Sequence, residues 1–243
     1  MQADLREFAL RLGDDSLVLG QRLSEWCGHA PMLELDLSLA NIALDLVGQA
    51  THFLSLAGDA DQLAFHRDVL DFKNCLLVEQ PNEDFAQTVA RQFLFSNWQE
   101  LTLRELIGSK HPGLAAIAAK AFKEVAYHVR FTDEWVVRLG DGTQESRARM
   151  TRGLEWVWRF GDELFDVDPV LERLIVAGIA VDVRDLRSEW EARLGKTLAR
   201  ATLDVPKPRR GARGGRIGHH SEHLGHLLAQ MQFLPRAYPG ASW

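Results

Sequence analysis

The sequence predicts an all-α protein built as a four-helix bundle with additional C-terminal helices. Apolar residues recur at helical spacing over several long stretches, and the eight prolines stand at the breaks between them. Strand signals are nearly absent, because no alternating polar and apolar runs are joined by a hairpin turn. Four predicted helices of about 12 to 28 residues have the dimensions of such a bundle.

Capping residues and prolines indicate where the bundle helices begin. Asn82 is expected to cap the third helix, with Asp84 in its first turn, and Pro112 suits the first turn of the fourth. The second helix is apolar on nearly every side, so we expect it at the centre of the core. The predicted ranges are 15–26, 34–57, 82–107 and 112–139.

Shorter helices are expected after the Gly140-Asp141-Gly142 break. Their predicted ranges are 146–165, 169–177, 182–194 and 219–236. A chain of 243 residues is long for one domain, yet a single core can serve it. We therefore expect one domain over 1–243, with the core bundle at about 10–140 and appended helices at about 146–243.

Composition excludes several classes of protein. The net charge of −6 is the opposite of what nucleic-acid binding usually requires. Two cysteines are too few for a secreted disulfide framework, and no apolar run approaches the 18 residues of a membrane span. The N-terminus lacks the apolar block of a secretion signal. The expectation is a cytoplasmic protein that binds neither membranes nor nucleic acid.

Long helical bundles can house two iron ions, which need a Glu-x-x-His pair on each of two helices. This sequence departs from that pattern. On the second helix, Asp45 is followed three residues later by Gly48, which has no ligating side chain. On the fourth, Glu124 is followed by Tyr127, and His128 comes one residue too late. These degenerate positions predict that the chain binds no metal.

The remaining polar residues of these helices do not restore the site. Among the candidate ligands of the third helix, Glu100 is the one carboxylate. A buried di-iron centre would therefore have too few carboxylates to compensate its positive charge. A stripe on the second helix is better explained as a buried polar network. That stripe comprises Ser38, Asn41, Asp45, His52 and Ser55.

A basic, glycine-rich stretch lies near the C-terminus. Glycine-rich backbone beside arginines can hold phosphate, so a contact with coenzyme A phosphates is one hypothesis and a solvated loop is the other. We favour the solvated loop, because no strand precedes the glycines and no phosphate-loop pattern is present. The arginines concerned are Arg209, Arg210, Arg213 and Arg216.

Histidines cluster just after this stretch. His219, His223 and His226 share a helix face, but one straight helix spreads them over about two turns, or roughly 10 Å. Three imidazoles so spaced do not converge easily on one ion. An interface or a helix-start cluster, with Glu222 near the positive helix end, explains them equally simply.

Several segments together resemble one known family. The segments are RLGDDSLVLGQRLSEWCGHAP at 11–31, DLSLANIALDLVGQA at 36–50, LLVEQPNEDFAQTVARQ at 76–92, KEVAYHVRF at 123–131, ELFDVD at 163–168 and HSEHLGHLLAQMQFLPR at 220–236. The sequence resembles the PaaC-type C subunits of the bacterial ring-1,2-phenylacetyl-CoA epoxidase, and the likeness covers essentially the whole chain. His220, Glu222 and His223 belong to the family motif.

The resemblance implies a ferritin-like fold and a structural role in a multicomponent monooxygenase of phenylacetate breakdown. It implies a homologous catalytic A subunit that carries the di-iron centre, a further B subunit, and a reductase with NADPH, FAD and an iron–sulfur cluster. This subunit would hold no cofactor and would be inactive alone. When isolated, it is expected to form a homodimer through the face that normally meets its partner.

Two other functions stay open. The chain could be an active di-metal oxidase that uses Asp45, Glu100, Glu124 and His128, or a coenzyme A-binding accessory module that uses the four arginines. The reaction, substrate and partner depend on the resemblance alone. Complex stoichiometry and the partner-binding face do not follow from the sequence.

Overall fold

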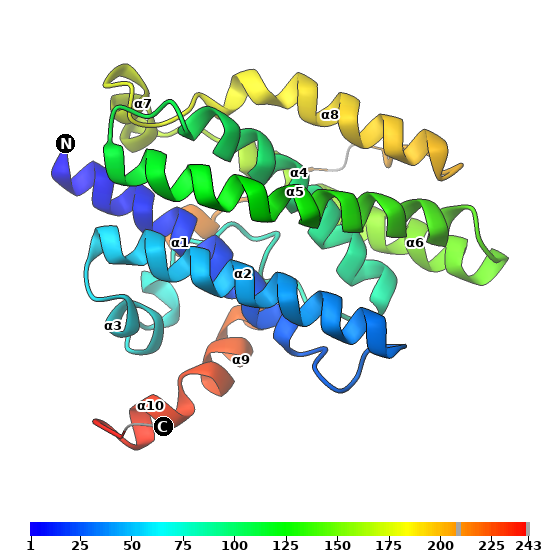
Figure 1. The fold of residues 1–243 in the computed structure, drawn as a ribbon, viewed down its shortest axis with the longest axis horizontal. Helices are drawn as coiled ribbons and strands as arrows, with labels where there is room; N and C mark the ends of the chain where they lie inside the picture. The colour runs from blue at the N-terminus through cyan, green and yellow to red at the C-terminus, as the bar shows by residue number, and fades with distance from the viewer. Residues whose placement is uncertain (208–209, 242–243) are drawn as a thin grey trace. The chain divides into compact units, whose positions relative to one another are not determined.

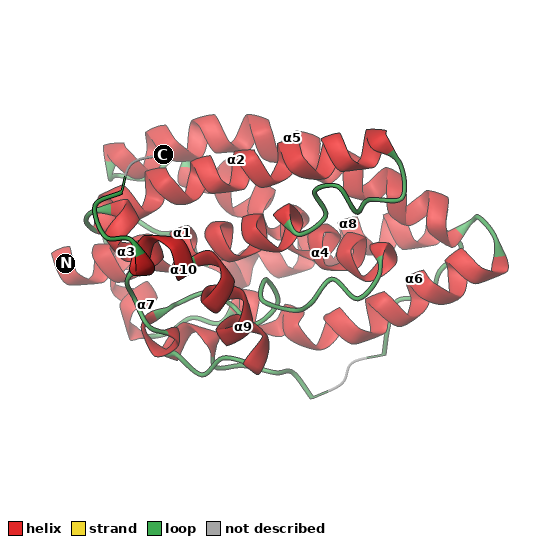
Figure 2. Ribbon diagram, turned by 90° about the horizontal axis from the view of Figure 1, so that it is seen from below, coloured by secondary structure: helices red, strands yellow, loops and turns green. Residues whose placement is uncertain are grey.

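A computed structural model describes residues 1–207 and 210–241. Within these residues all regular structure is helical, as expected for a ferritin-like helical bundle (Figure 2). No described helix is long and apolar enough to cross a membrane. The contacts group the chain into two compact units, Met1 with Asn82–Ala212 and Gln2–Pro81 with Arg213–Trp243. The expectation of one domain over 1–243 stays a prediction.

The unit formed by the two ends of the chain is organised by one long antiparallel helix pair, α1 with α2 (Figure 1). A Cβ added at Gly13 would lie 2.7 Å from the Leu54 side chain, and one at Gly20 would lie 3.2 Å from the carbonyl oxygen of Ala43. These glycines let the two helices approach closely. The elements are α1 (Gln2–Ser24), α2 (Leu33–Ala57), α3 (Ala60–Phe65), η1 (Val69–Asp71), η3 (Gly215–Ile217), α9 (Glu222–Met231) and α10 (Phe233–Ala237).

The other unit is built on α4 and α5, with further helices packed against them. Helix α4 contacts α5, α6, α8 and η2, and it is buried on nearly every side. Trp190 of α8 packs against Phe165 and donates a hydrogen bond from Nε1 to the Leu94 carbonyl oxygen at 3.0 Å. The elements are α4 (Phe85–Leu106), α5 (Pro112–Gly140), α6 (Gln144–Val157), η2 (Trp158–Phe165), α7 (Pro169–Val176) and α8 (Val183–Arg200).

The long middle helices lie close to their predicted ranges, but several boundaries were wrong. Helix α1 begins at Gln2 and not near residue 15, α8 continues to Arg200 and not 194, and the stretch after residue 157 is a 3-10 helix. The cap of α4 is Asp84, whose Oδ1 accepts from the Gln87 amide at 2.9 Å. Asn82, the predicted cap, instead accepts from Arg91 Nη2 at 2.7 Å.

Helix α2 is not the buried centre that its composition predicted. Leu33, Leu37 and Leu44 are 71%, 57% and 68% exposed. At about 100° per residue these three side chains lie within about 40° of one another, on a single outer face. The most extensively buried helices are α1 and α4. Both bury polar side chains, so their sequences are less apolar than that of α2 and did not indicate burial.

Candidate functional site

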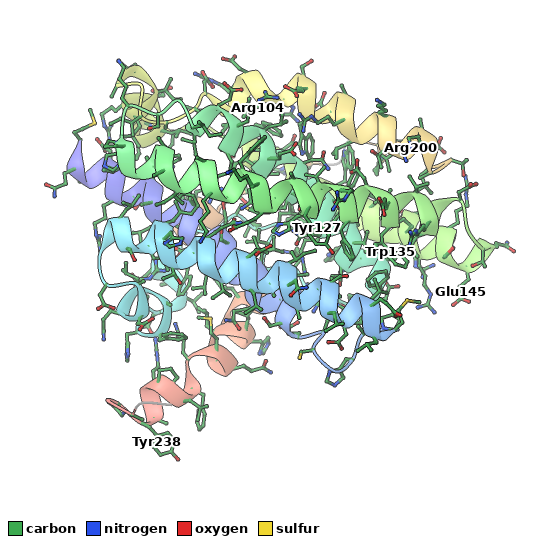
Figure 3. The ribbon with its side chains drawn as sticks, in the orientation of Figure 1. Arg104, Tyr127, Trp135, Glu145, Arg200 and Tyr238 are labelled. Atoms are coloured by element: carbon green, nitrogen blue, oxygen red, sulfur yellow. The ribbon has the colours of Figure 1, made fainter. Side chains whose placement is uncertain are left out.

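The three predicted positions on α5 lie on or near an aromatic row. Tyr127 follows Glu124 by three residues, and its ring centroid lies 6.2 Å from that of Phe131, which lies 6.4 Å from that of Trp135 (Figure 3). Trp135 meets Phe85 of α4 edge to face at 5.2 Å. Tyr127 therefore packs along its own helix, and Trp135 at the other end of the row connects α5 to the start of α4.

Glu124 and His128 lie beside this row. Among the described residues, they do not belong to a group of three or more side chains that could hold a metal ion. Glu124 is half-buried and faces Lys120 on the preceding turn, 4.0 Å away. His128 is fully buried, and its carbonyl oxygen accepts from Thr132 Oγ1 at 2.9 Å. A lysine beside a carboxylate competes with a metal cation for the same negative charge.

The predicted positions on α2 lie at its surface. Asp45 and Gly48 are both half-buried, and a Cβ added at Gly48 would meet nothing within 4 Å. The buried network predicted for this helix was wrong: Asn41, His52 and Ser55 are exposed. Ser55 Oγ donates to the Thr51 carbonyl oxygen of its own helix at 2.7 Å.

The carboxylate of α4 considered as a ligand is held in an ion pair. Glu100 accepts from Arg193 of α8, which also contacts Glu189 at 2.7 Å. Arg104 donates to both carboxylate oxygens of Glu189 at 2.9 Å. These arginines lower the pKa of Glu189 to about 2, with the hydrogen bond from Arg104 as the largest cause. The acids between α4 and α8 thus serve to hold the two helices together.

One more acid lies in the same unit and was not predicted. Asp133 of α5 accepts from Thr197 Oγ1 of α8 at 3.1 Å and from Asn97 Nδ2 of α4 at 3.4 Å. Burial raises the pKa of this carboxyl, and the hydrogen bonds from Asn97 and Thr197 offset part of the shift. Asp133 therefore joins three helices at one point.

The donor set does not fit a di-iron centre. Such a centre needs inward-facing glutamates and Glu-x-x-His pairs. In this chain Gly48 follows Asp45 by three residues and Tyr127 follows Glu124 by three, so histidine is absent from both places. Within the parts of the chain that the structure describes, no group of three or more His, Cys, Asp or Glu side chains is arranged to hold a metal ion.

The four arginines of the basic loop do not share one environment. Arg209 lies outside the described residues. Arg210 and Arg213 are exposed. Arg216 is half-buried, and it donates to Asp15 Oδ2 at 2.8 Å and to the Lys73 carbonyl oxygen at 3.0 Å. The contact with coenzyme A phosphates stays a prediction, and Arg216 is already committed to an internal ion pair.

The glycines of this loop have a packing role that the sequence did not reveal. A Cβ added at Gly215 would lie 2.2 Å from the Asn74 carbonyl oxygen, and one at Gly218 would lie 2.5 Å from that of Leu70. Gly218 also has a φ of +85°, which favours glycine. The loop backbone is thus pressed against the 70–76 segment.

The motif histidine His220 lies in a buried cluster with Glu79. Its Nδ1 is 2.8 Å from Glu79 Oε2, and its Nε2 is 3.0 Å from the Phe72 carbonyl oxygen. Glu222 is exposed in the first turn of α9, and the carbonyl oxygen of His223 accepts from Arg22 Nη2 at 2.9 Å. The motif therefore joins α9 to α1 and to the segment before α4.

Sequence reasoning missed the partners of this cluster. Glu79, Asn74, Asp14 and Asp15 are fully or almost fully buried, although each is polar. Asp15 Oδ1 accepts from the Cys75 amide at 2.8 Å, and Asp14 binds Arg67. The available signal was that Asp14, Asp15, Glu79 and His220 all fall within the segments that carry the family resemblance.

Comparison with known proteins agrees with the architecture. The family model described as "Phenylacetic acid catabolic protein" matches residues 1–243. The chain is 52% identical over 245 aligned residues to the C subunit of 1,2-phenylacetyl-CoA epoxidase from Escherichia coli (strain K12), covering 98% of this chain and 99% of that relative. The chain therefore belongs to the phenylacetic acid catabolic protein family.

Proposed function

We propose that this chain is a non-catalytic, structural subunit of a phenylacetyl-CoA epoxidase that acts in phenylacetate catabolism. The observation that carries the assignment is its identity with the C subunit of the Escherichia coli epoxidase over nearly the full length of both chains. The proposed partners are a homologous catalytic A subunit with a di-iron centre, a B subunit and a reductase with NADPH, FAD and an iron–sulfur cluster. The proposed location is the cytoplasm.

The structural role is supported by the surroundings of two degenerate metal positions, Tyr127 and Gly48, and of Glu100, the carboxylate considered on α4. Tyr127 packs in an aromatic row, Glu100 is bound to Arg193, and Gly48 has no side chain. Tyr127 contributes to packing and Glu100 to helix association, and none of the three supplies a ligand set for two metal ions. We therefore assign the oxygen chemistry to the partner and support of its fold to this chain.

For the partner, we propose docking of the A subunit on the outer face of α2. Leu33, Leu37 and Leu44 form one exposed apolar row on this helix. An exposed row of large apolar side chains on one member of a multi-subunit enzyme is typical of an interface.

Co-purification with the A subunit tests this assignment. We expect the unmodified chain to co-purify with the cognate A subunit, and the variant Leu37→Glu/Leu44→Glu to lose at least about tenfold in affinity, because two charges would enter an apolar contact. The variant should keep the circular dichroism of a folded helical protein, since these side chains are exposed.

Val176→Glu serves as the matched control, because Val176 is 89% exposed on α7 and lies outside the proposed interface. It should bind the A subunit as the unmodified chain does. Failure of the unmodified chain to bind would refute the partner assignment, and equal binding by the leucine variant would refute the choice of α2.

A further inference from the structure

Glu79 and His220 form a buried acid–histidine pair that the proposed function does not use. Both side chains are 0% exposed, and His220 Nδ1 lies 2.8 Å from Glu79 Oε2. The two residues are 141 positions apart in the sequence. The pair therefore joins the C-terminal segment to the segment before α4, within one compact unit.

Both ring nitrogens of His220 face an oxygen that can accept a hydrogen bond. Nε2 lies 3.0 Å from the backbone carbonyl oxygen of Phe72. A carbonyl oxygen has no hydrogen to donate, so Nε2 must carry one. Nδ1 faces Glu79 Oε2, and the donors that converge on this carboxylate stabilise its anion. Nδ1 must then carry a hydrogen as well, which makes the ring an imidazolium.

The other contacts of Glu79 agree with an ionised carboxylate. Its Oε2 accepts from Asn74 Nδ2 at 2.9 Å, and its Oε1 accepts from the Ser221 amide at 2.6 Å. With His220, three donors converge on the two oxygens. Hydrogen bonds to a charged acceptor are short and strong, and donors in this number stabilise the anion.

The arginines near the pair form ion pairs with carboxylates other than Glu79. Arg22 of α1 donates to the Glu79 backbone carbonyl at 3.0 Å, and its guanidinium also faces the Glu25 carboxylate at 2.7 Å. Arg216, on the loop before α9, faces Asp15 of α1 at 2.8 Å.

Two further groups complete the surroundings. Asp14 of α1 faces Arg67, and Glu222 of α9 is exposed to solvent. Each neighbouring arginine thus has a carboxylate of its own, and the cation that balances Glu79 is the ring of His220.

We propose that His220 is a buried imidazolium and that its contacts with Glu79 and Phe72 form a pH-sensitive clasp, which fastens the segment 213–231 to the 72–80 segment. Loss of the proton from His220 removes one of the two donor bonds and leaves Glu79 with a buried, unbalanced charge. Raising the pH therefore favours opening of the clasp. His220 acts as a positioning residue, and the inference does not depend on the proposed function.

Nuclear magnetic resonance of the full chain tests the protonation state. With ¹⁵N-labelled histidine, we expect both ring nitrogens of His220 to give the signals of protonated nitrogens at pH 7. His219 is exposed and adjacent, so its signals provide the reference for a histidine side chain in solvent. A bare ring nitrogen on His220 at pH 7 would overturn the proposal, and this result needs no variant to fold.

Hydrogen exchange of the Ser221 amide tests the clasp itself, because this amide donates to Glu79. At pH 7, His220→Gln should speed its exchange by at least about tenfold, since a glutamine cannot bridge both acceptors as a cation. The matched control His219→Gln should leave the exchange rate unchanged. Unchanged exchange in His220→Gln, or an equal increase in both variants, would contradict the clasp.

Discussion

At the scale of single residues, Gly215 shows how closely the basic loop is packed. An added Cβ would lie 2.2 Å from the Asn74 carbonyl oxygen and 3.1 Å from the Leu76 amide nitrogen. Backbone atoms cannot rotate aside as a side chain can. We expect Gly215→Ala to lower the free energy of unfolding by about 3 kcal/mol, as measured by urea denaturation.

Gly195 of α8 provides the control for this substitution. A Cβ added there meets nothing within 4 Å, and the residue lies inside a helix. Gly195→Ala should therefore raise the free energy of unfolding by up to about 1 kcal/mol. Equal effects of the two substitutions would show that the loop is not pressed against the 70–76 segment.

Asp133 predicts a specific dependence of stability on pH. Its pKa is raised above the ordinary value of 3.8 because the carboxyl is buried, so the folded protein holds this proton more tightly than the unfolded chain. The contribution of Asp133 to stability therefore increases as the pH falls from neutral towards 3.8, and it is lost as the pH rises through the folded-state value.

Comparison with Asp133→Asn isolates this contribution. The variant keeps the size of the side chain and should be within about 1 kcal/mol of the unmodified chain at pH 7. On acidification, the unmodified chain should gain stability relative to the variant in parallel urea titrations. A constant difference between the two proteins from pH 7 to pH 4 would be inconsistent with a raised pKa.

Local sequence patterns predict the role of some residues but not of others. The pattern at Glu124 and Tyr127 predicts a degenerate metal position, and this stays a prediction. In contrast, Asp14 and Asp15 interrupt the apolar pattern of α1 and delayed its predicted start, because their partners Arg67 and Arg216 are distant in the sequence. Buried ion pairs between distant residues leave no local signature.

At the scale of helices, α2 has one buried and one exposed apolar face. Leu46 is 0% exposed, whereas Leu44 is 68% exposed two residues earlier. Truncating the buried side chain loses transfer energy and leaves a cavity, so Leu46→Ala should cost about 2–5 kcal/mol of unfolding free energy. Leu44→Ala should stay within about 0.5 kcal/mol, and urea denaturation of the two variants measures both.

This pair of substitutions also shows where the sequence prediction for α2 failed. Leucines on every side predicted a helix at the centre of the core, but the composition of a helix does not distinguish burial within one chain from burial against a partner. If Leu44→Ala were as destabilising as Leu46→Ala, the exposed row on α2 would not be an outer face.

Helix boundaries were predictable where a cap or a proline fixes them. Pro112 begins α5 as expected, and Asp168 caps α7 by accepting from the Leu171 amide at 3.0 Å. The end of α8 was placed too early, since Gly195 interrupts its pattern although the helix continues through Arg200. A glycine inside a helix weakens it without ending it.

At the scale of the whole molecule, the all-helical class and the family follow from periodicity and from the motifs together. The buried clasp of Glu79 and His220 and the ion pairs of α1 explain why motif segments near the two ends of the chain contain charged residues. These residues maintain the fold of what we propose to be a supporting subunit, and we assign the oxygen chemistry to its partner.

The iron content of the chain purified alone from iron-replete cells distinguishes a supporting subunit from a di-iron enzyme. Elemental analysis against protein concentration should give well below one iron per chain, because Gly48 and Tyr127 stand where a Glu-x-x-His pattern would need histidine. About two irons per chain, bound within the helices as in di-iron carboxylate proteins, would contradict the assignment of a supporting subunit.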